Sequence, residues 1–509
     1  MADRLFIIRL AGDFYTKSRG TRLQFQRRLA SNVRDALRAS GIPHRLERTW
    51  SRFYLETEDA GASEVLTRVF GVQSVSEVER RPWSTLDDVV RAGVEVFAGK
   101  VQGRSFAVRA SRRSKNGQRE VFGFDSQAVE IALGRALLDA GAGRVDLGAP
   151  EVTAYVELEP GGAHLFEDKA RGHGGLPIGV EGRALALVSG GFDSAVASWI
   201  LLKRGVQLDY LFCNLGGTAH RLGVLKVLEV LATRWSYGSR PRLHEVDFQP
   251  LAAEIQAGTN PRNWQILLKR QMVRAGEIIG RRTGRLALIT GDAIGQVSSQ
   301  TLQNLAVVSQ AASALPILRP LLGFNKEEIL ALARQIGIYE LSAAVGEYCA
   351  LVPRKPATRA PLKETLAEES VLDLGRLDEL IAARQTYELR RLAPELLAPP
   401  ELEIGHVPEG ATVLDLRPKS AWQAWHYPDS LRLDFPQALQ TFGSFDRERT
   451  YVLVCEVGLK SAHLAEEMRK GGFRAYHFAG GAGELMELEA RKRRLSGLER
   501  ALLAPAVRD

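Results

Sequence analysis

One short turn between an apolar strand and a helix constrains this chain more than any other feature. Residues 189–194, SGGFDS, follow the strand-like ALALV (184–188) and precede the helical AVASWILLKRG. Small residues at such a turn let backbone N–H groups approach a phosphate, and the helix dipole adds positive potential there. We therefore expect a parallel α/β sheet that binds an anion at this turn. A glycine turn without a ligand is the alternative, and the flanking strand and helix disfavour it.

A second polar segment follows another apolar stretch in the same region. Residues 290–302, TGDAIGQVSSQTL, come directly after RLALI (285–289). Their small, hydrogen-bonding side chains suit the crevice at the carboxyl ends of strands, where doubly wound sheets bind ligands. A polar loop by itself is usually only a solvated loop. This segment indicates a ligand site only in combination with the 189–194 turn.

Length and pattern breaks predict several domains. At roughly 150 residues per domain, a chain of 509 residues makes about three or four. Two α+β units come first, and the second is expected to be antiparallel. A glycine-rich connection at 172–179 then leads into strands that alternate with helices, typical of a doubly wound parallel sheet. Proline-rich segments separate that sheet from a smaller α/β unit. The predicted units are residues 1–60, 61–170, 180–395 and 403–490.

Composition limits the class of protein. Hydrophobic residues make up 45% and charged residues 25%, the balance of a globular protein, and no apolar run approaches the ~20 residues of a membrane span. The N-terminal MADRLFIIRL lacks a long apolar core and a cleavage site. We therefore expect a cytoplasmic protein with no membrane partner. Only three cysteines occur, without a CxxC pair, so neither a disulfide framework nor a zinc or other metal site is predicted.

Cys455 ends the apolar strand YVLVC and is followed by the loop EVGLK and a helix beginning SAHLAEEM. Loop N–H groups and a helix N-terminus stabilise a thiolate or persulfide there, and Lys460 adds a positive charge. This pattern predicts a nucleophilic cysteine, whereas a buried inert cysteine is the default for any single one. Cys349 lies outside any evident strand and is a candidate second redox thiol. Cys213 lies within the apolar LDYLFCNL and is interpreted as packing.

Positive charge is concentrated near the N-terminus. The net charge is +8, and two long stretches contain basic residues but no acidic one, between Asp13 and Asp35 and between Glu95 and Glu120. Lysine and arginine clusters bind nucleic-acid phosphates by releasing counterions, although any one of them can simply be a solvated helix face. Together the two stretches favour RNA. The candidate RNA-binding residues are Lys17, Arg19, Arg22, Arg109, Arg112, Arg113 and Lys115.

These segments, in this order, resemble the tRNA uridine 4-sulfurtransferase family. SGGFDS is similar to the PP-loop of ATP pyrophosphatases, the Cys455 loop with Asp415-Leu416-Arg417 resembles a rhodanese domain, and FCNLGGTAH, ILRPL and EYCALVPRKPAT also match. The resemblance implies a multidomain α/β fold: ferredoxin-like and THUMP α+β domains, a doubly wound PP-loop domain and a C-terminal rhodanese-like α/β domain. Lys460 stands where many rhodaneses place Arg, and Glu456 follows the nucleophile, so thiosulfate turnover is not expected.

The resemblance also implies roles for individual residues. Cys455 would carry the persulfide with Cys349 as its disulfide partner, and Asp193 and Lys326 would serve adenylation, with Mg²⁺ accompanying ATP. The residues expected to hold ATP are Leu187, Val188, Ser189, Gly190, Gly191, Phe192, Asp193, Ser194, Lys269, Gly291 and Gln300.

The implied reaction is formation of 4-thiouridine at position 8 of tRNA. ATP would adenylate the uridine, and a persulfide supplied by a cysteine desulfurase would provide the sulfur. Two alternatives remain. One is sulfur supply for the thiazole of thiamine through a sulfur-carrier protein, for which the rhodanese-like domain alone would suffice. The other is an RNA-binding protein with inert motifs, which the presence of Asp193, Cys349 and Cys455 disfavours.

Overall fold

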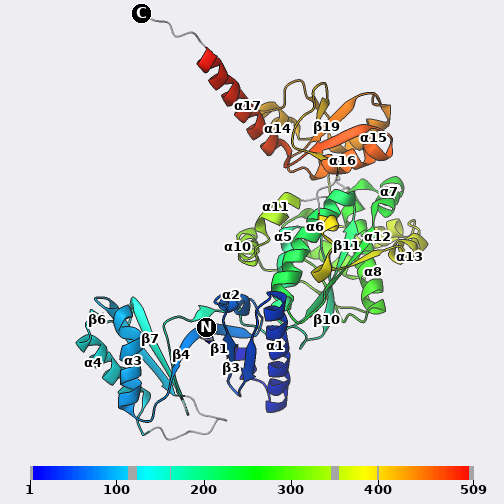
Figure 1. Cartoon of the computed structure of the whole chain (residues 1–509). Coiled ribbons are helices and arrows are strands. Elements are labelled where there is room, and N and C mark those ends of the chain that lie inside the picture. The colour runs from blue at the N-terminus through cyan, green and yellow to red at the C-terminus, as the bar shows by residue number, and fades with distance from the viewer. Residues whose placement is uncertain (1–3, 113–122, 161, 346–354, 398–400, 504–509) are drawn as a thin grey trace, which may run out of the picture. The chain divides into compact units, whose positions relative to one another are not determined.

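The computed structural model describes residues 4–112, 123–160, 162–345, 355–397 and 401–503 (Figure 1). The chain divides into two compact units. The first contains residues up to 181 together with 202–206 and 234–239, and the second contains the remainder. Among the described residues, no helix is long and apolar enough to cross a membrane.

The first unit is built around one mixed sheet. Its strand order is β2-β3-β1-β4-β8-β7-β5-β6, and β9 also pairs with β4. The strands are β1 (Arg4–Leu10), β2 (Arg45–Arg48), β3 (Arg52–Thr57), β4 (Val72–Arg81), β5 (Ser105–Arg112), β6 (Arg144–Val145), β7 (Val152–Glu159), β8 (Gly162–Phe166) and β9 (Ala170–Arg171). The helices are α1 (Arg19–Ala39), α2 (Ala62–Thr67), α3 (Leu86–Val101) and α4 (Ser126–Asp139).

The sequence prediction of an antiparallel second unit is wrong in one respect. Strands β7 and β8 do pair antiparallel, but β5 pairs parallel with both β7 and β6. Helix α4 lies between β5 and β7 in the chain, so it can serve as the crossover that a parallel pair needs. Alternating hydrophobicity identifies a strand without identifying its partner, which is why the direction of this pair was not predictable.

The second unit contains two sheets. The larger runs β14-β13-β10-β11-β12-β15, parallel except for the edge strand β15. Its strands are β10 (Arg183–Leu187), β11 (Gln207–Asn214), β12 (Arg242–Asp247), β13 (Leu288–Ile289), β14 (Ile317–Leu318) and β15 (Gln385–Glu388). Its helices are α5 (Phe192–Lys203), α6 (Gly217–Val230), α7 (Gln249–Gly258), α8 (Trp264–Arg282), α9 (Leu302–Ser309), α10 (Lys326–Ile336), α11 (Tyr339–Val345), α12 (Leu362–Glu369) and α13 (Leu374–Ala382).

The smaller sheet lies nearer the C-terminus and is parallel throughout. Its order is β16-β20-β19-β17-β18. The strands are β16 (Glu403–Ile404), β17 (Thr412–Asp415), β18 (Leu431–Arg432), β19 (Thr450–Val454) and β20 (Arg474–Phe478), and the helices are α14 (Lys419–Ala424), α15 (Phe435–Thr441), α16 (Leu459–Lys470) and α17 (Gly481–Leu503). Together the sheets confirm the predicted fold class of α+β and parallel α/β domains.

The core of the larger sheet fixes the strand ends that matter for function. Leu185 of β10, Leu211 of β11 and Leu288 of β13 are at most 1% exposed and pack in one apolar cluster with α8. Because these neighbouring strands are parallel, their carboxyl ends lie on the same edge of the sheet. The loops that follow β10 and β13 therefore converge.

A buried ion-pair cluster fastens α12 to α8. Glu369, at the end of α12, accepts hydrogen bonds from Arg270, Gln271 and Arg274 of α8, and Arg270 is 1% exposed. A buried carboxylate needs such partners, because breaking a buried pair costs about 3–5 kcal/mol. The cluster thereby holds α8, which also carries Lys269, in a fixed position.

Candidate nucleotide and sulfur sites

The SGGFDS loop (residues 189–194) joins β10 to α5. Gly190 has a φ of +81°, which favours glycine, and a Cβ there would crowd the side chains of Val345 at 3.0 Å and Val224 at 3.1 Å. Ser194 closes the loop: its hydroxyl donates to the Gly191 carbonyl at 3.2 Å and accepts from the Ser189 N–H at 3.4 Å. The loop wraps the N-terminus of α5, where positive potential is greatest.

The loop after β13 packs directly against the SGGFDS loop. A Cβ at Gly291 would lie 2.6 Å from the backbone of Asp193 and Ser194, so only glycine allows this approach. Two adjoining cavities, of about 240 and 670 Å³, lie along the two loops. Their combined size is in the range of small-molecule sites. Both cavities are lined by Ser189, Asp193, Ser194, Leu215, Lys269, Met272 and Gln300.

The cavities bring most of the predicted nucleotide-binding residues together. Leu187, Val188 and Gly291 line the smaller one, and Gly191, Phe192 and Lys326 line the larger one. Gly190 is not among the lining residues of either cavity and packs against Val345. Cys213 also lines the smaller cavity, and burial raises the pKa of its thiol.

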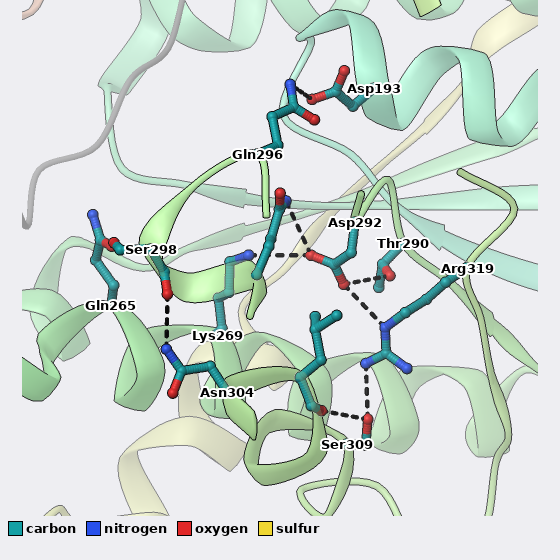
Figure 2. A network of polar contacts seen from close by, with 12 residues as sticks. Asp193, Gln265, Lys269, Thr290, Asp292, Gln296, Ser298, Asn304, Ser309 and Arg319 are labelled. Carbon is teal, nitrogen blue, oxygen red and sulfur yellow. Dashed lines mark hydrogen bonds and ion pairs between the residues drawn. The ribbon is translucent and has the colours of Figure 1, made fainter. Parts of the chain in front are cut away.

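Asp292 is the centre of a polar network in this site (Figure 2). Its Oδ1 lies 3.1 Å from Lys269 Nζ and 3.3 Å from Gln300 Nε2. Its Oδ2 accepts from Thr290 Oγ1 at 2.7 Å and from Arg319 Nε at 3.2 Å. Burial opposes ionisation of Asp292, but the Lys269 charge and the Thr290 and Arg319 contacts hold its pKa below the usual range.

This network orients the groups that face the cavity. Since Gln300 Nε2 is directed to Asp292, the amide oxygen of this buried side chain is left as an acceptor, and Gln300 lines both cavities. Asp292 and Arg319 were not among the residues selected from the sequence. Both fall within segments that resemble the family, TGDAIGQVSSQTL and ILRPL, but nothing local indicates that they pair.

Asp193 and Lys326 meet at the larger cavity. Lys326 Nζ lies 3.1 Å from Asp193 Oδ1, and Gln296 Nε2 donates to Asp193 Oδ2 at 3.1 Å. Lys326 is the first residue of α10, whose start is fixed by a capping box between Asn325 and Glu328. Its side chain is 39% exposed, so its ammonium group stays accessible from the cavity. The arrangement offers one carboxylate and two lysines, counting Lys269, around a space that suits a polyphosphate.

His220 supports the SGGFDS loop from α6. Its Nε2 lies 3.1 Å from the Ser189 carbonyl oxygen and therefore donates to it. Burial lowers the pKa of His220 to about 4, with a smaller contribution of the opposite sign from this hydrogen bond. The ring is accordingly neutral at pH 7.

Cys455 directly follows β19 and is 1% exposed. Its Sγ lies 3.4 Å from the Ser461 N–H and 3.3 Å from the Ser461 hydroxyl, in the first turn of α16. Gly458, with a φ of +93°, turns the chain into that helix. Lys460 Nζ lies 3.8 Å from Glu456, so this acid compensates the positive charge expected to act on the sulfur.

Asp415 and Arg417 form an ion pair at the carboxyl end of β17, the strand that pairs with β19. Arg417 Nη2 lies 2.7 Å from Asp415 Oδ2, and both residues are buried.

Cys349 lies outside the described residues. Val345, the last described residue before that segment, is 2% exposed and contacts the SGGFDS loop, and after the segment Ala357 is bound by Asn304.

The candidate RNA-binding residues of α1 and its preceding turn differ in exposure. Lys17 and Arg19 are exposed. Arg22 is 8% exposed, because its guanidinium donates to the Trp50 carbonyl at 2.9 Å and lies over the Trp50 ring. Arg22 therefore presents little of its charge to a ligand.

The second basic stretch lies on and after β5. Arg109 and Arg112 are exposed and donate to the carbonyls of Leu147 and Phe124, whereas Arg113 and Lys115 lie outside the described residues. Arg109 also lines a cavity of about 350 Å³ with Arg9 and Lys169, which charge counting along the sequence did not select.

Family comparisons cover nearly the whole chain. A family described as Thiamine biosynthesis protein (ThiI) matches residues 179–374, and the ThiI ferredoxin-like, THUMP and rhodanese-like domains match residues 5–76, 84–168 and 401–487. The chain is 38% identical over 476 residues to a tRNA sulfurtransferase of Pyrobaculum aerophilum, covering 92% of this chain and 95% of that protein. It is 34% identical over 482 residues to a tRNA sulfurtransferase of Escherichia coli, covering 92% and 98%.

Among solved structures, the chain is similar to a 4-thiouridine synthetase crystallised with RNA and bound ATP. The TM-score is 0.65 at 30% identity, and the match covers 76% of this chain and 99% of that one.

Proposed function

The chain belongs to the ThiI family of tRNA sulfurtransferases, and on that premise we propose that it makes 4-thiouridine at position 8 of tRNA by adenylation followed by persulfide transfer. The observation that carries the proposal is the meeting of Asp193, Lys269 and Lys326 around one cavity beside a glycine turn, in the same unit as a cysteine cradled by a helix N-terminus. The related synthetase that binds RNA and ATP supports both substrates.

Adenylation comes first, because the O4 oxygen of uridine is a poor leaving group. O4 attacks the α-phosphorus of ATP, the bond to the β-phosphate oxygen breaks, and pyrophosphate leaves. Charge develops on the pyrophosphate, so the ammonium groups of Lys269 and Lys326 and the N–H groups of the SGGFDS loop lower the barrier. Leu187 and Val188, at the end of β10, and Gln300 contact the remainder of the nucleotide.

Mg²⁺ fits this site as a companion of ATP. Among the described residues, no group of three or more His, Cys, Asp or Glu side chains could hold a metal by itself. Mg²⁺ commonly binds through one or two carboxylates together with substrate phosphates. Asp193 is the carboxylate that would hold it, because its side chain is 24% exposed and lines the larger cavity, whereas the Asp292 side chain is 10% exposed and already has four partners, Lys269, Arg319, Thr290 and Gln300. Bound there, the ion would neutralise phosphate charge.

Sulfur transfer follows. The terminal sulfur of the Cys455 persulfide attacks C4 of the activated base, and AMP departs with the former O4. The product is a disulfide between C4 and Cys455. The Cys349 thiolate then attacks the Cys455 sulfur, releasing 4-thiouridine and leaving a Cys349–Cys455 disulfide, which a two-electron reductant restores. In a second route Cys349 attacks the persulfide first, and hydrosulfide is the nucleophile at C4.

The residues flanking the Cys349 segment support its role. Val345 packs on Gly190 of the SGGFDS loop, and Asn304 binds both the Ala357 carbonyl and the Ala360 N–H. The chain thus enters and leaves this segment beside the nucleotide cavity.

We assign tRNA binding to the first unit, through the exposed cations Lys17, Arg19, Arg109 and Arg112 together with Arg113 and Lys115. A cysteine desulfurase would load Cys455. Sulfur supply for the thiamine thiazole, through a sulfur-carrier protein, is a second candidate role that the ThiI family description favours. That role needs Cys455 but not the nucleotide cavity, so Asp193→Ala should spare it.

One assay tests the proposed function. Purified protein is incubated with unmodified tRNA, ATP, cysteine and a desulfurase, and the tRNA is digested. We expect a thionucleoside that absorbs in the near ultraviolet, with AMP and pyrophosphate formed in step with it. Absence of the thionucleoside, or its formation without ATP, would refute the proposal.

A further inference from the structure

Helix α16, which cradles the Cys455 sulfur, contacts the N-terminus of α6 within the second unit. Glu466 Oε2 accepts from the Thr218 N–H at 2.9 Å, and Glu466 Oε1 accepts from the Thr218 hydroxyl at 3.1 Å. Thr218 is the second residue of α6, and its N–H has no intrahelical acceptor. The residue before the helix, Gly216, supplies no capping side chain. Glu466 therefore caps α6 from the rhodanese-like domain.

Two glycines lie at the start of α6, and Gly217 is the one that faces α16. Gly217 has a φ of +65°, and a Cβ there would lie 2.5 Å from Glu466 Oε2 and 3.4 Å from His463 Nδ1. A Cβ at Gly216 would lie 2.8 Å from His220. Glu466 is 19% exposed and His463 is 5% exposed, so the contact is close and largely shielded from water. A carboxylate at a helix N-terminus in such a setting is stabilised by the helix dipole.

The contact lies between the two chemical sites. On one side, His220, in the first turn of α6, donates to the Ser189 carbonyl in the SGGFDS loop. On the other side, Ser461 in the first turn of α16 holds the Cys455 sulfur. Helices α6 and α16, joined by the Glu466–Thr218 contact, therefore connect the nucleotide loop with the sulfur loop.

We propose that this α6–α16 contact is the docking surface through which the rhodanese-like domain engages the nucleotide-binding domain for sulfur transfer, and that Glu466 is its recognition residue. The proposal rests on the proposed function and adds the surface that the transfer uses. Glu466 acts here as a positioning residue, because it touches neither the nucleotide nor the sulfur.

The test compares two neighbouring carboxylates on one helix. Both carboxylates pair with Lys470, Glu466 at 3.6 Å and Glu467 at 2.7 Å, so Glu467→Gln controls for loss of that pair, whereas Glu466→Gln also removes the charge that caps α6. With desulfurase as donor, we expect thionucleoside formation to slow about tenfold in Glu466→Gln, the loss typical of a charged hydrogen bond, and less than about twofold in Glu467→Gln. Sulfur loading of Cys455 should match wild type in both variants.

A second experiment uses inorganic sulfide as the sulfur donor, because sulfide can attack the adenylated base without a carrier domain. With sulfide in place of desulfurase, Glu466→Gln should equal wild type. Equal rates of Glu466→Gln and wild type with the desulfurase would overturn the proposal, and so would an equal loss with sulfide, since Glu466 would then act on adenylation. A wild-type protein that makes no thionucleoside with either donor would instead refute the proposed function.

Hydrogen exchange gives a readout independent of activity. In wild-type protein the Thr218 amide should be protected, and in Glu466→Ala the peptide containing Thr218 should exchange several-fold faster while peptides of β10 stay unchanged. Thr218→Val removes the hydroxyl but keeps the N–H, so it should slow desulfurase-driven thiolation less than Glu466→Gln does. Unchanged exchange in Glu466→Ala would overturn the docking surface.

Discussion

Two turns in the second unit share one arrangement, a strand followed by a loop and a helix N-terminus, and differ in what surrounds them. The SGGFDS loop follows β10 and begins α5, and the Cys455 loop follows β19 and begins α16. The first opens on a cavity of about 670 Å³ flanked by Lys269 and Lys326. The second closes around Cys455, a residue that is 1% exposed and whose sulfur lies within hydrogen-bond distance of the N–H and the hydroxyl of Ser461.

The difference matches the charge that each turn is proposed to hold. A triphosphate carries several charges, and a helix terminus contributes only about half an elementary charge, so side-chain cations are needed. A single thiolate or persulfide needs only nearby N–H and O–H groups. Lys460 and Arg417, the cations near the sulfur loop, are compensated by Glu456 and Asp415. A cation bound tightly to the sulfur would also lower its nucleophilicity, so this arrangement suits a sulfur that must attack the activated base.

Removing the carboxylate of the first turn should have the largest effect. Asp193→Ala takes away the acceptor that pairs with Lys326 and Gln296, and we expect thionucleoside and AMP formation to fall by at least about 10³-fold. Binding of tRNA, measured by a salt titration, should stay within about twofold of wild type, because the basic stretches lie in the first unit. Loss of tRNA binding in this variant would contradict the division between nucleotide and RNA sites.

Removing the thiol of the second turn should separate the two steps. In Cys455→Ala we expect desulfurase-driven thiolation to fall by more than about 100-fold, since the covalent carrier is gone. AMP formation on tRNA should remain measurable, because the SGGFDS loop is intact. Thiolation with inorganic sulfide should also persist. Equal thiolation of this variant and wild type with the desulfurase would mean that sulfur travels by another route.

Neutralising Asp292 tests whether the cations of the first turn need an internal counter-charge. Asp292→Asn keeps the shape but leaves Lys269 and Arg319 close together without the shared carboxylate (Figure 2). Loss of such charged hydrogen bonds costs about 1.5–3 kcal/mol, so we expect the KM for ATP to rise about 10- to 100-fold. Transfer from a loaded Cys455 to an already adenylated tRNA should change little. An unchanged KM would mean that Lys269 and Gln300 hold their positions without Asp292.

These two turns also mark what the sequence can predict. The SGGFDS and Cys455 turns were predicted because strand, turn and helix lie together in the chain, and local pattern determines them. Asp292 and Arg319 were missed because they are far apart in sequence and meet only after β13 and β14 pair. Arg22 illustrates the same limit: its place in a basic stretch indicates RNA, but only the fold reveals that Trp50 covers it. The parallel pairing of β5 with β7 was likewise hidden from the alternation of apolar residues.

The smallest expected effects come from one hydroxyl in each turn. Ser194 and Ser461 each lie in the first turn of the helix that follows, but Ser194 binds its own loop whereas Ser461 binds the reacting sulfur. Ser461→Ala removes one of two contacts to sulfur, so desulfurase-driven thiolation should fall about three- to tenfold, the value of one hydrogen bond. Ser461→Thr, which keeps the hydroxyl, should recover most of the rate.

Ser194→Ala should give the reverse pattern, with a similar loss in AMP formation and no change in the rate at which iodoacetamide alkylates Cys455. In Ser461→Ala that alkylation rate should fall while AMP formation matches wild type. If either serine variant impaired both measurements equally, the two turns would not be separate anion sites, and the contact between α6 and α16 would have to couple them more strongly than one capping carboxylate allows.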